Sequence, residues 1–247
     1  MKLKLYGERH TNTNYLQQLL SLNLDCDWIE GVVPTWRRTI ERFGILDARD
    51  RYFARTRTTN YGWKHTAVDP ADELKDTRAI TLTKNPYAWV VSMHRRPYHL
   101  KNATALSIDA FVRQNWQTLG RDNLNKESMS IAKLWNRKNS SYFNLSDERS
   151  IHLTSEEVQL NPKETVSKVA EFMQQQPAEE FRDVERSTKK RPDKNADYYR
   201  DYYGRELWRK SLSESALETL NAELDQSLMA KFGYEFIHDL SVDNSGD

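Results

Sequence analysis

The order of apolar and polar residues at the start of the chain changes from strand spacing to helix spacing. Leu3, Leu5 and Tyr6 lie among lysines in an alternating pattern, which is typical of a strand. A polar stretch over residues 8–12 follows. From Thr13 to Leu22 the apolar residues recur at helical spacing. The pattern therefore predicts a strand, a loop and an amphipathic helix in that order.

The same reading predicts further strands and helices along the chain. The clearest buried strand covers 78–83 and ends at Lys84-Asn85-Pro86, where Pro86 suits the first turn of a helix over 87–94. A weaker strand is predicted within 27–33, a strand end within 62–68 and a short strand at 150–154. Helices are predicted at 107–116, 128–139, 162–175, 199–210 and 213–232, whereas 33–60 has no clear pattern.

Strands that alternate with helices predict an α/β fold with a mainly parallel central sheet flanked by helices. We expect a single domain over residues 1–238 and a frayed acidic tail over 239–247. Ligands of such sheets bind at the carboxyl ends of the strands. Three segments are candidates there, namely 9–14, 64–65 and 84–92.

Composition limits the classes of partner. The chain has 247 residues, 38% hydrophobic and 30% charged, with a formal net charge of +1. So small a net charge argues against general nucleic-acid binding. No apolar run approaches a membrane span and no secretory signal is visible, so we expect a cytoplasmic protein. The one cysteine, Cys26, has acidic neighbours that raise a thiol pKa, which favours a structural role.

The loop after the first predicted strand has the features of an anion site. It places Arg9, His10 and the hydroxyls of Thr11 and Thr13 at a helix N-terminus, where backbone amides are unpaired and the dipole end is positive. It lacks the glycines and the Gly-Lys-Ser/Thr ending of a Walker A loop. An ordinary strand–loop–helix junction capped by Thr11 or Asn12 is the alternative interpretation.

A second segment adds a cation and a hydroxyl. Lys84 stands at a strand end and Ser92 lies two turns into the next helix, which ends with Arg95 and Arg96. A cation and a hydroxyl that converge in this way form a natural phosphate clamp. A helix that starts at a proline and ends in solvated arginines is the alternative.

Together the two segments resemble the donor site of the sulfotransferase family, whose members use 3′-phosphoadenosine-5′-phosphosulfate (PAPS). The family loop reads roughly Pro-Lys-Ser-Gly-Thr-Thr before an aromatic residue and a leucine; here residues 9–14 precede Tyr15-Leu16. The family's second motif is Arg-Asn-Pro, five residues and Ser; here it is Lys84-Asn85-Pro86 and Ser92. Three further segments agree in order and spacing: Gly62–His65, Glu156–Val158 before Asn161-Pro162, and Phe232–Tyr234.

The departures from the family pattern concern the donor site itself. His10 occupies the position of the loop lysine, Asn12 replaces the loop glycine, and Lys84 replaces an arginine. Asn12 would then need a positive φ, which asparagine tolerates. Thr154 stands where the family often has an arginine. The family's glycine-rich segment near the 3′-phosphate has no clear copy, although Lys189, Lys190 and Arg191 are possible substitutes.

The resemblance implies a P-loop NTPase-like sulfotransferase fold and transfer of a sulfuryl group from PAPS to a hydroxyl or amine. It implies that residues 9–14, namely Arg9, His10, Thr11, Asn12, Thr13 and Asn14, hold the 5′-phosphosulfate, and that Lys84 and Ser92 hold the 3′-phosphate. By the same resemblance His65 is the general base, Lys64 stabilises the moving sulfonate, and His10 also serves catalysis. The product is 3′-phosphoadenosine 5′-phosphate (PAP), and no metal is expected.

Several alternatives stay open at this stage. Glu8 could be the base instead, although a carboxylate near the donor's charge is electrostatically poor. A small-molecule or nucleotide kinase, or a binding module that keeps PAP without turnover, would use the same fold. Segments 35–60 and 94–121 favour a polar or carbohydrate-like acceptor. The tyrosines between 198 and 203 are expected mainly to pack, and nothing in the sequence fixes the oligomeric state.

Overall fold

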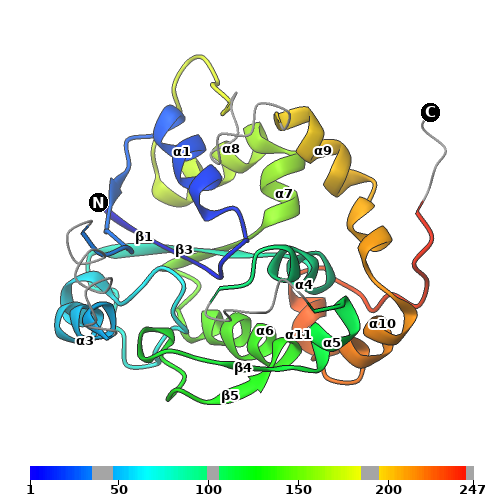
Figure 1. The fold of residues 1–247 in the computed structure, drawn as a ribbon. Coiled ribbons are helices and arrows are strands. Elements are labelled where there is room, and N and C mark those ends of the chain that lie inside the picture. The colour runs from blue at the N-terminus through cyan, green and yellow to red at the C-terminus, as the bar shows by residue number, and fades with distance from the viewer. Residues whose placement is uncertain (35–46, 99–105, 185–194, 243–247) are drawn as a thin grey trace.

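A central parallel sheet organises the molecule (Figure 1). The computed structural model describes residues 1–34, 47–98, 106–184 and 195–242. Its four-stranded sheet has the order β2-β1-β3-β6, with β1 at Lys2–Gly7, β2 at Asp27–Trp28, β3 at Thr77–Thr83 and β6 at Ser150–Thr154. All three pairings are parallel, which confirms the predicted α/β class.

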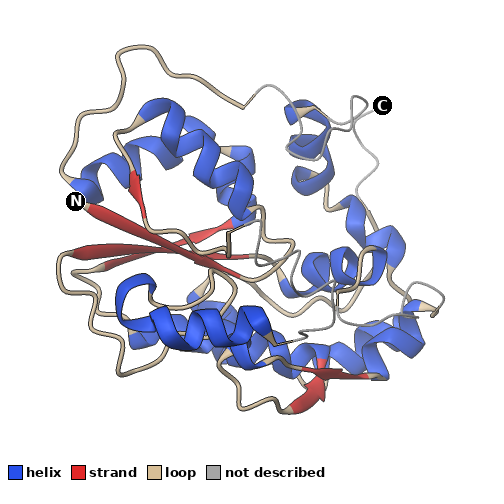
Figure 2. Ribbon diagram, turned by 60° about the vertical axis from the view of Figure 1, so that its left-hand side comes forward, coloured by secondary structure: helices blue, strands red, loops and turns tan. Residues whose placement is uncertain are grey.

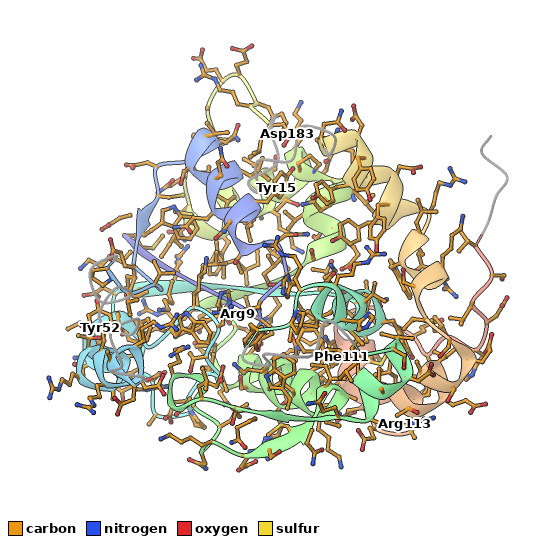
Figure 3. All side chains as sticks on the ribbon, viewed as in Figure 1. Arg9, Tyr15, Tyr52, Phe111, Arg113 and Asp183 are labelled. Carbon is orange, nitrogen blue, oxygen red and sulfur yellow. The ribbon has the colours of Figure 1, made fainter. Side chains whose placement is uncertain are left out.

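The alternation along β1 sends its residues to two different cores. Leu3 and Leu5 pack with α1 (Thr13–Asn23) and α8 (Pro162–Met173) on one face of the sheet. Tyr6 joins the larger core on the other face, which includes α4 (Pro86–Arg95) and α6 (Ile131–Ser140). Figure 2 shows the strands between these helical layers. Burying both faces is what a parallel sheet requires.

Smaller elements complete the fold. The helices are α3 (Ala48–Asn60), α5 (Ile108–Arg113), α7 (Ser155–Leu160), α9 (Ala196–Gly204), α10 (Glu214–Asn221) and α11 (Gln226–Lys231). Short 3₁₀ turns lie at Gly120–Asp122, Ser141–Asn144 and Leu207–Ser211. β4 (Asn115–Gln117) and β5 (Ser128–Ser130) pair antiparallel beside the main sheet.

The first strand and helix, the strand before Lys84, the helix after it and the strand at 150–154 are confirmed. Four helix predictions ran too far. Those over 107–116 and 128–139 included residues that pair as β4 and β5, and those over 199–210 and 213–232 each break into two shorter helices. Ser213 does cap α10, since its hydroxyl accepts from the Ala216 amide. Asp225 caps α11 in the same way.

Residues 62–68 were predicted as a strand end, and this was wrong. The segment instead contacts the end of β1 and the segment after β2 through single backbone hydrogen bonds. The Lys64 N–H donates to Gly31 O, and the Gly7 N–H donates to Lys64 O. These two bonds fix the segment across the end of β1 without a ladder. The predicted strand within 27–33 is reduced to Asp27–Trp28.

Only part of the expected acidic tail lies within the described residues. Residues 239–242 have neither helix nor strand, and 243–247 of the expected tail lie outside the described residues. Within the described ranges, none of the helices has the length and apolar character needed to cross a membrane. Cys26 packs at the edge of the smaller core, where burial and then Asp25 raise the pKa of its thiol to about 11.

Candidate functional site

The sheet order places two loops side by side. The chain leaves β1 toward β2 and returns to β3 on the opposite side of β1, so the strand order reverses between β1 and β3. Gly7, the last residue of β1, pairs with Leu82 of β3. The loop after β1 and the loop after β3 therefore begin next to each other. A reversal of this kind is where ligands bind in open α/β sheets.

The loop after β1 is held in an unusual backbone conformation. His10 has a φ of 68° and Asn12 a φ of 65°, both left-handed, and Asn12 is the N-cap of α1. The expected positive φ at Asn12 is thus present. The Asn12 amide also donates to Ser155 Oγ at 2.8 Å, which ties the loop to α7. A Cβ on Gly7 would come within 2.7 Å of Thr13 Cγ2, so only glycine fits beneath this loop.

A large cavity opens in front of the loop. Its volume is about 640 Å³, within the range of small-molecule sites. Loop residues, the start of α1 and the segment after α3 line it, as follows: Arg9, His10, Asn12, Thr13, Asn14, Tyr15, Gln17, Trp28, Glu30, Gly31, Val32, Val33, Arg49, Phe53, Trp63, Lys64 and His65. The predicted residues of the first loop other than Thr11 therefore meet the Lys64-His65 pair at one cavity.

Arg9 presents its guanidinium to this cavity. Its guanidinium lies between two aromatic rings, 5.2 Å from the Trp63 ring centroid and 4.2 Å from that of Tyr98. Its Nε is buried and has no hydrogen-bond partner. Within the described ranges no carboxylate pairs with the guanidinium. A cation held by rings and left unpaired is suited to bind an anion.

The ring of His65 is oriented for proton transfer. Its Nδ1 lies 2.5 Å from Gly7 O, and since a carbonyl only accepts, Nδ1 carries the proton. Nε2 is then the basic nitrogen, and no described residue hydrogen bonds to it. Burial, and next the Lys64 ammonium, hold the pKa of His65 well below 6.5. The imidazole is therefore neutral at physiological pH, as a general base must be.

Lys64 lies beside His65 and points toward the start of α1. Its Nζ donates to Asn14 Oδ1 at 2.6 Å. Its backbone is anchored on both sides, to Gly31 and to Gly7. A Cβ on Gly31 would approach Lys64 Cβ within 2.5 Å, so the close contact of the two segments depends on that glycine. The ammonium is thus fixed at the cavity wall.

A buried ionic network below His65 was not predicted. Lys138 of α6 is fully buried and its Nζ pairs with Asp122 Oδ1 at 2.8 Å and Glu8 Oε2 at 3.1 Å. The same Nζ donates to His65 O. Burial opposes the charge, but the two carboxylates outweigh it and raise the pKa of Lys138. The network explains why Glu8 does not line the large cavity: its carboxylate is engaged below the site.

Lys84 lies where the second loop begins and its side chain is enclosed. Its Nζ donates to Ser92 Oγ at 2.9 Å and to the Tyr203 hydroxyl at 2.8 Å, with His10 O at 3.5 Å. Burial lowers the pKa of Lys84 to about 8, while Glu156 opposes this shift. The predicted convergence of Lys84 and Ser92 is thus present, with a tyrosine of α9 added to it.

A second, smaller cavity of about 150 Å³ lies over this cluster. Its described lining has four basic or imidazole side chains and no carboxylate, as follows: His10, Asn12, Lys84, Ser92, Arg95, Arg96, Tyr198, Tyr199, Tyr202 and Tyr203. His10 and Asn12 line both cavities, so the two adjoin at the first loop. The His10 ring is held there, because its Nε2 lies 2.9 Å from Arg96 O.

Most of the predicted site residues meet at these two cavities, and Thr11 does not. Its hydroxyl is buried and donates to Glu8 O at 2.6 Å, so it shapes the loop from behind. Trp89 is core, and its Nε1 supports the loop by donating to Arg9 O at 2.7 Å. Lys189 to Arg191 lie outside the described residues. Among the described side chains, no group of three or more His, Cys, Asp or Glu is placed to hold a metal ion.

Two sets of residues have a place at the site that the sequence did not predict. The tyrosines of α9 were expected mainly to pack, yet four of them line the smaller cavity. Tyr198 stacks on Tyr202 and Tyr199 on Tyr203, with centroids 6.0 and 6.4 Å apart. The i, i+4 spacing of the four tyrosines was the available signal. For Lys138, the only available signal was that a lysine lies on an otherwise apolar face of the predicted helix.

Comparisons with solved structures agree with the α/β fold class described above. No family model matches the sequence, and no curated protein matches it. Among solved structures, the chain is similar to the sulfotransferase domain from the curacin biosynthetic pathway, with a TM-score of 0.45 and 11% identity over 96% of this chain and 98% of that one. It is also similar to the sulfotransferase domain of the Synechococcus PCC 7002 olefin synthase, with a TM-score of 0.42 and 12% identity over 90% and 93%. The function of this chain must therefore be inferred from the geometry and chemistry of its site.

Proposed function

We propose that the protein is a sulfotransferase that moves a sulfuryl group from PAPS to a hydroxyl or amine of a small polar acceptor. The observation that carries the proposal is the pair of adjoining cavities at the ends of β1 and β3. One contains a neutral histidine and a guanidinium that no described carboxylate pairs with. The other contains a lysine–serine–tyrosine cluster, and its described lining residues include no carboxylate. A donor with anionic groups at both ends fits such a pair.

The larger cavity suits the phosphosulfate and the acceptor. Arg9, Lys64 and the amides at the start of α1 supply positive charge for the sulfonate and the adjoining phosphate. Transfer of a sulfuryl group resembles phosphoryl transfer, in which charge spreads over equatorial oxygens while the entering and leaving oxygens stay in line. Fixed cations and dipoles, rather than covalent catalysis, then lower the barrier.

His65 takes the proton in this mechanism. The acceptor oxygen or nitrogen gives its proton to Nε2 and forms a bond to sulfur, while the bond from sulfur to the phosphate oxygen breaks. The electron pair of that bond leaves with PAP, whose new charge lies near Lys64. Nδ1 keeps its hydrogen bond to Gly7 O throughout, which fixes the tautomer and steadies the imidazolium.

The outer wall of the larger cavity supports a polar acceptor. The rings of Trp28, Phe53 and Trp63 line it together with the charged side chains of Glu30 and Arg49. Rings next to hydrogen-bonding groups match a molecule that has both apolar faces and hydroxyls, as a carbohydrate does. Of these wall residues, Arg49 and Phe53 belong to the segment 35–60 that was expected to form the acceptor site.

The test measures donor binding and turnover separately. Thermal-shift assays compare PAP with ATP and magnesium, and transfer of radiolabelled sulfate from PAPS is followed with a panel of hydroxyl and amine acceptors. We expect stabilisation by PAP, and transfer that is lost in His65→Ala. Stabilisation by ATP and magnesium but not by PAP would instead favour a kinase. Binding of PAP with no transfer to any acceptor would indicate a module that has lost turnover.

A further inference from the structure

The inference concerns the hydroxyl of Tyr203 and rests on the proposed function. Tyr203 lies in the last turn of α9, far in sequence from both loops, and its side chain reaches the smaller cavity. Its oxygen lies 2.8 Å from Lys84 Nζ. Asn12 lines the same cavity. The hydroxyl thus joins α9 to the loop after β3, beside the loop after β1.

The chemistry of Lys84 fixes the direction of this bond. An ammonium has only donors, so the Tyr203 oxygen must accept from Lys84. Burial raises the pKa of Tyr203 above its ordinary value. The phenol therefore remains protonated. Its own hydrogen is not used in the contact with Lys84, and no described residue accepts it.

Two neighbouring donors, Ser92 and Arg95, are already engaged. The Ser92 hydroxyl donates to Ala88 O at 2.9 Å while it accepts from Lys84. The Arg95 guanidinium donates to the hydroxyls of Tyr202 and Ser211. The phenolic hydrogen of Tyr203 is thus a donor at the cavity wall that lacks an acceptor. A buried donor without an acceptor costs free energy, and a ligand acceptor would recover it.

The size and charge of the cavity indicate what that acceptor is. A volume of about 150 Å³ holds several waters but is well below that of a nucleoside site. The described residues that line it are basic or polar, and none of them is a carboxylate. A phosphate group meets both conditions. Lysine is a point charge with fewer donors than arginine, so an additional donor next to Lys84 helps to grip a phosphate.

We propose that the Tyr203 hydroxyl donates a hydrogen bond to the 3′-phosphate of the donor nucleotide, and that it acts with Lys84 and Ser92 as the third member of the site. The tyrosine then contributes to discrimination between nucleotides that have a 3′-phosphate and those that lack it. Tyr142, in contrast, is buried in the core, lines neither cavity, and its hydroxyl has no described hydrogen-bond partner.

Tyr203→Phe tests the proposal, with Tyr142→Phe as the matched control. Calorimetry measures the affinities of each protein for PAP and for adenosine 5′-monophosphate, which lacks the 3′-phosphate. Hydrogen bonds to charged groups contribute about 1.5–3 kcal/mol, so we expect a loss of about ten-fold or more in PAP affinity. The affinity for the monophosphate, and both affinities of Tyr142→Phe, should stay near those of the wild type.

The ratio of the two affinities is measured within each protein, so a partial loss of folded material cancels. An unchanged ratio in Tyr203→Phe, with the wild type still favouring PAP, would overturn the role of Tyr203 and leave the proposed function standing. A wild-type protein that does not favour PAP over the monophosphate would overturn the proposed function itself.

Discussion

Tyr234 donates its phenolic hydrogen to Glu156 Oε2 at 2.7 Å. The same carboxylate accepts from the Asn85 amide, at 3.2 Å from Oε1. Three segments that lie far apart in the sequence thus meet at one carboxylate, directly beside Lys84. Burial raises the pKa of Glu156, and Lys84 opposes that shift. The C-terminal Phe232-Gly233-Tyr234 therefore supports the loop after β3 from behind.

Tyr234→Phe should lower the stability of the fold. The change leaves one oxygen of a buried carboxylate without its hydroxyl partner, so we expect the free energy of unfolding to fall by about 1–3 kcal/mol. Urea unfolding measures it. Tyr199→Phe serves as the control, because its hydroxyl has no described hydrogen bond, and should change stability by less than about 0.5 kcal/mol. Equal stability of the two variants would show that the contact is not significant.

His65→Ala should separate turnover from binding. Removal of a general base typically costs about 10²–10⁴ in rate, whereas PAP affinity should persist because the donor's charges face other residues. Radiolabelled-sulfate transfer and calorimetry give the two readouts. An alanine variant that retains wild-type turnover would exclude His65 as the base.

The pH profile should reflect the lowered pKa of His65. The base works when neutral, and its pKa is held well below 6.5 by burial and then by Lys64. The rate should therefore stay level as the pH falls through 6.5 and decline only at lower pH. Lys64→Met removes the neighbouring charge, so its acidic limb should move upward even though the overall rate falls. An acidic limb at or above pH 6.5 in the wild type would contradict the assignment.

Replacing Lys84 by Met together with Ser92 by Ala should weaken PAP far more than adenosine 5′-phosphosulfate, which has no 3′-phosphate. Fluorescence or calorimetric titration measures both ligands. In the wild type the preference for PAP should also decline as the pH rises through about 8, because the Lys84 ammonium then loses its proton. A single Lys84→Met variant should lack this decline. Equal weakening of the two nucleotides in the double variant would place the 3′-phosphate elsewhere.

The left-handed conformation of Asn12 can be tested by a pair of substitutions. Asn12→Ala and Asn12→Gly both lose the amide bond to Ser155 and differ only in the cost of a positive φ. A left-handed alanine costs about 1–2 kcal/mol, and glycine adopts the conformation freely. Urea unfolding should therefore find the glycine variant more stable by about that amount. The opposite order would mean that the loop adopts another conformation.

Local sequence patterns predicted the parts of the fold that depend on neighbours along the chain. β1, β3 and the helices after them follow from alternation, from helical spacing and from Pro86. The pairing of Asn115–Gln117 with Ser128–Ser130 joins segments across a turn, and neither has a strand pattern of its own. α3 has no apolar stripe; ion pairs such as Arg57 with Asp72 and Asp50 with Arg121 anchor it.

Local sequence patterns also predicted only part of the site. The residues that follow strands were predicted because parallel strands end at one edge of a sheet. Lys138, Asp122 and Tyr203 come from other elements, and only the tertiary structure brings them to that edge. Polar side chains of this kind acquire their role from partners that no spacing in the sequence specifies.

The wall that the two cavities share at His10 and Asn12 has a consequence for competition among anions. Free phosphate or sulfate can occupy one cavity at a time and gains nothing from the other. A molecule with an anionic group at each end, once held in one cavity, presents its second group to the other at a high effective concentration. The arrangement therefore favours nucleotides with an anionic group at each end over inorganic anions. Neither cavity has to bind its anionic group tightly by itself.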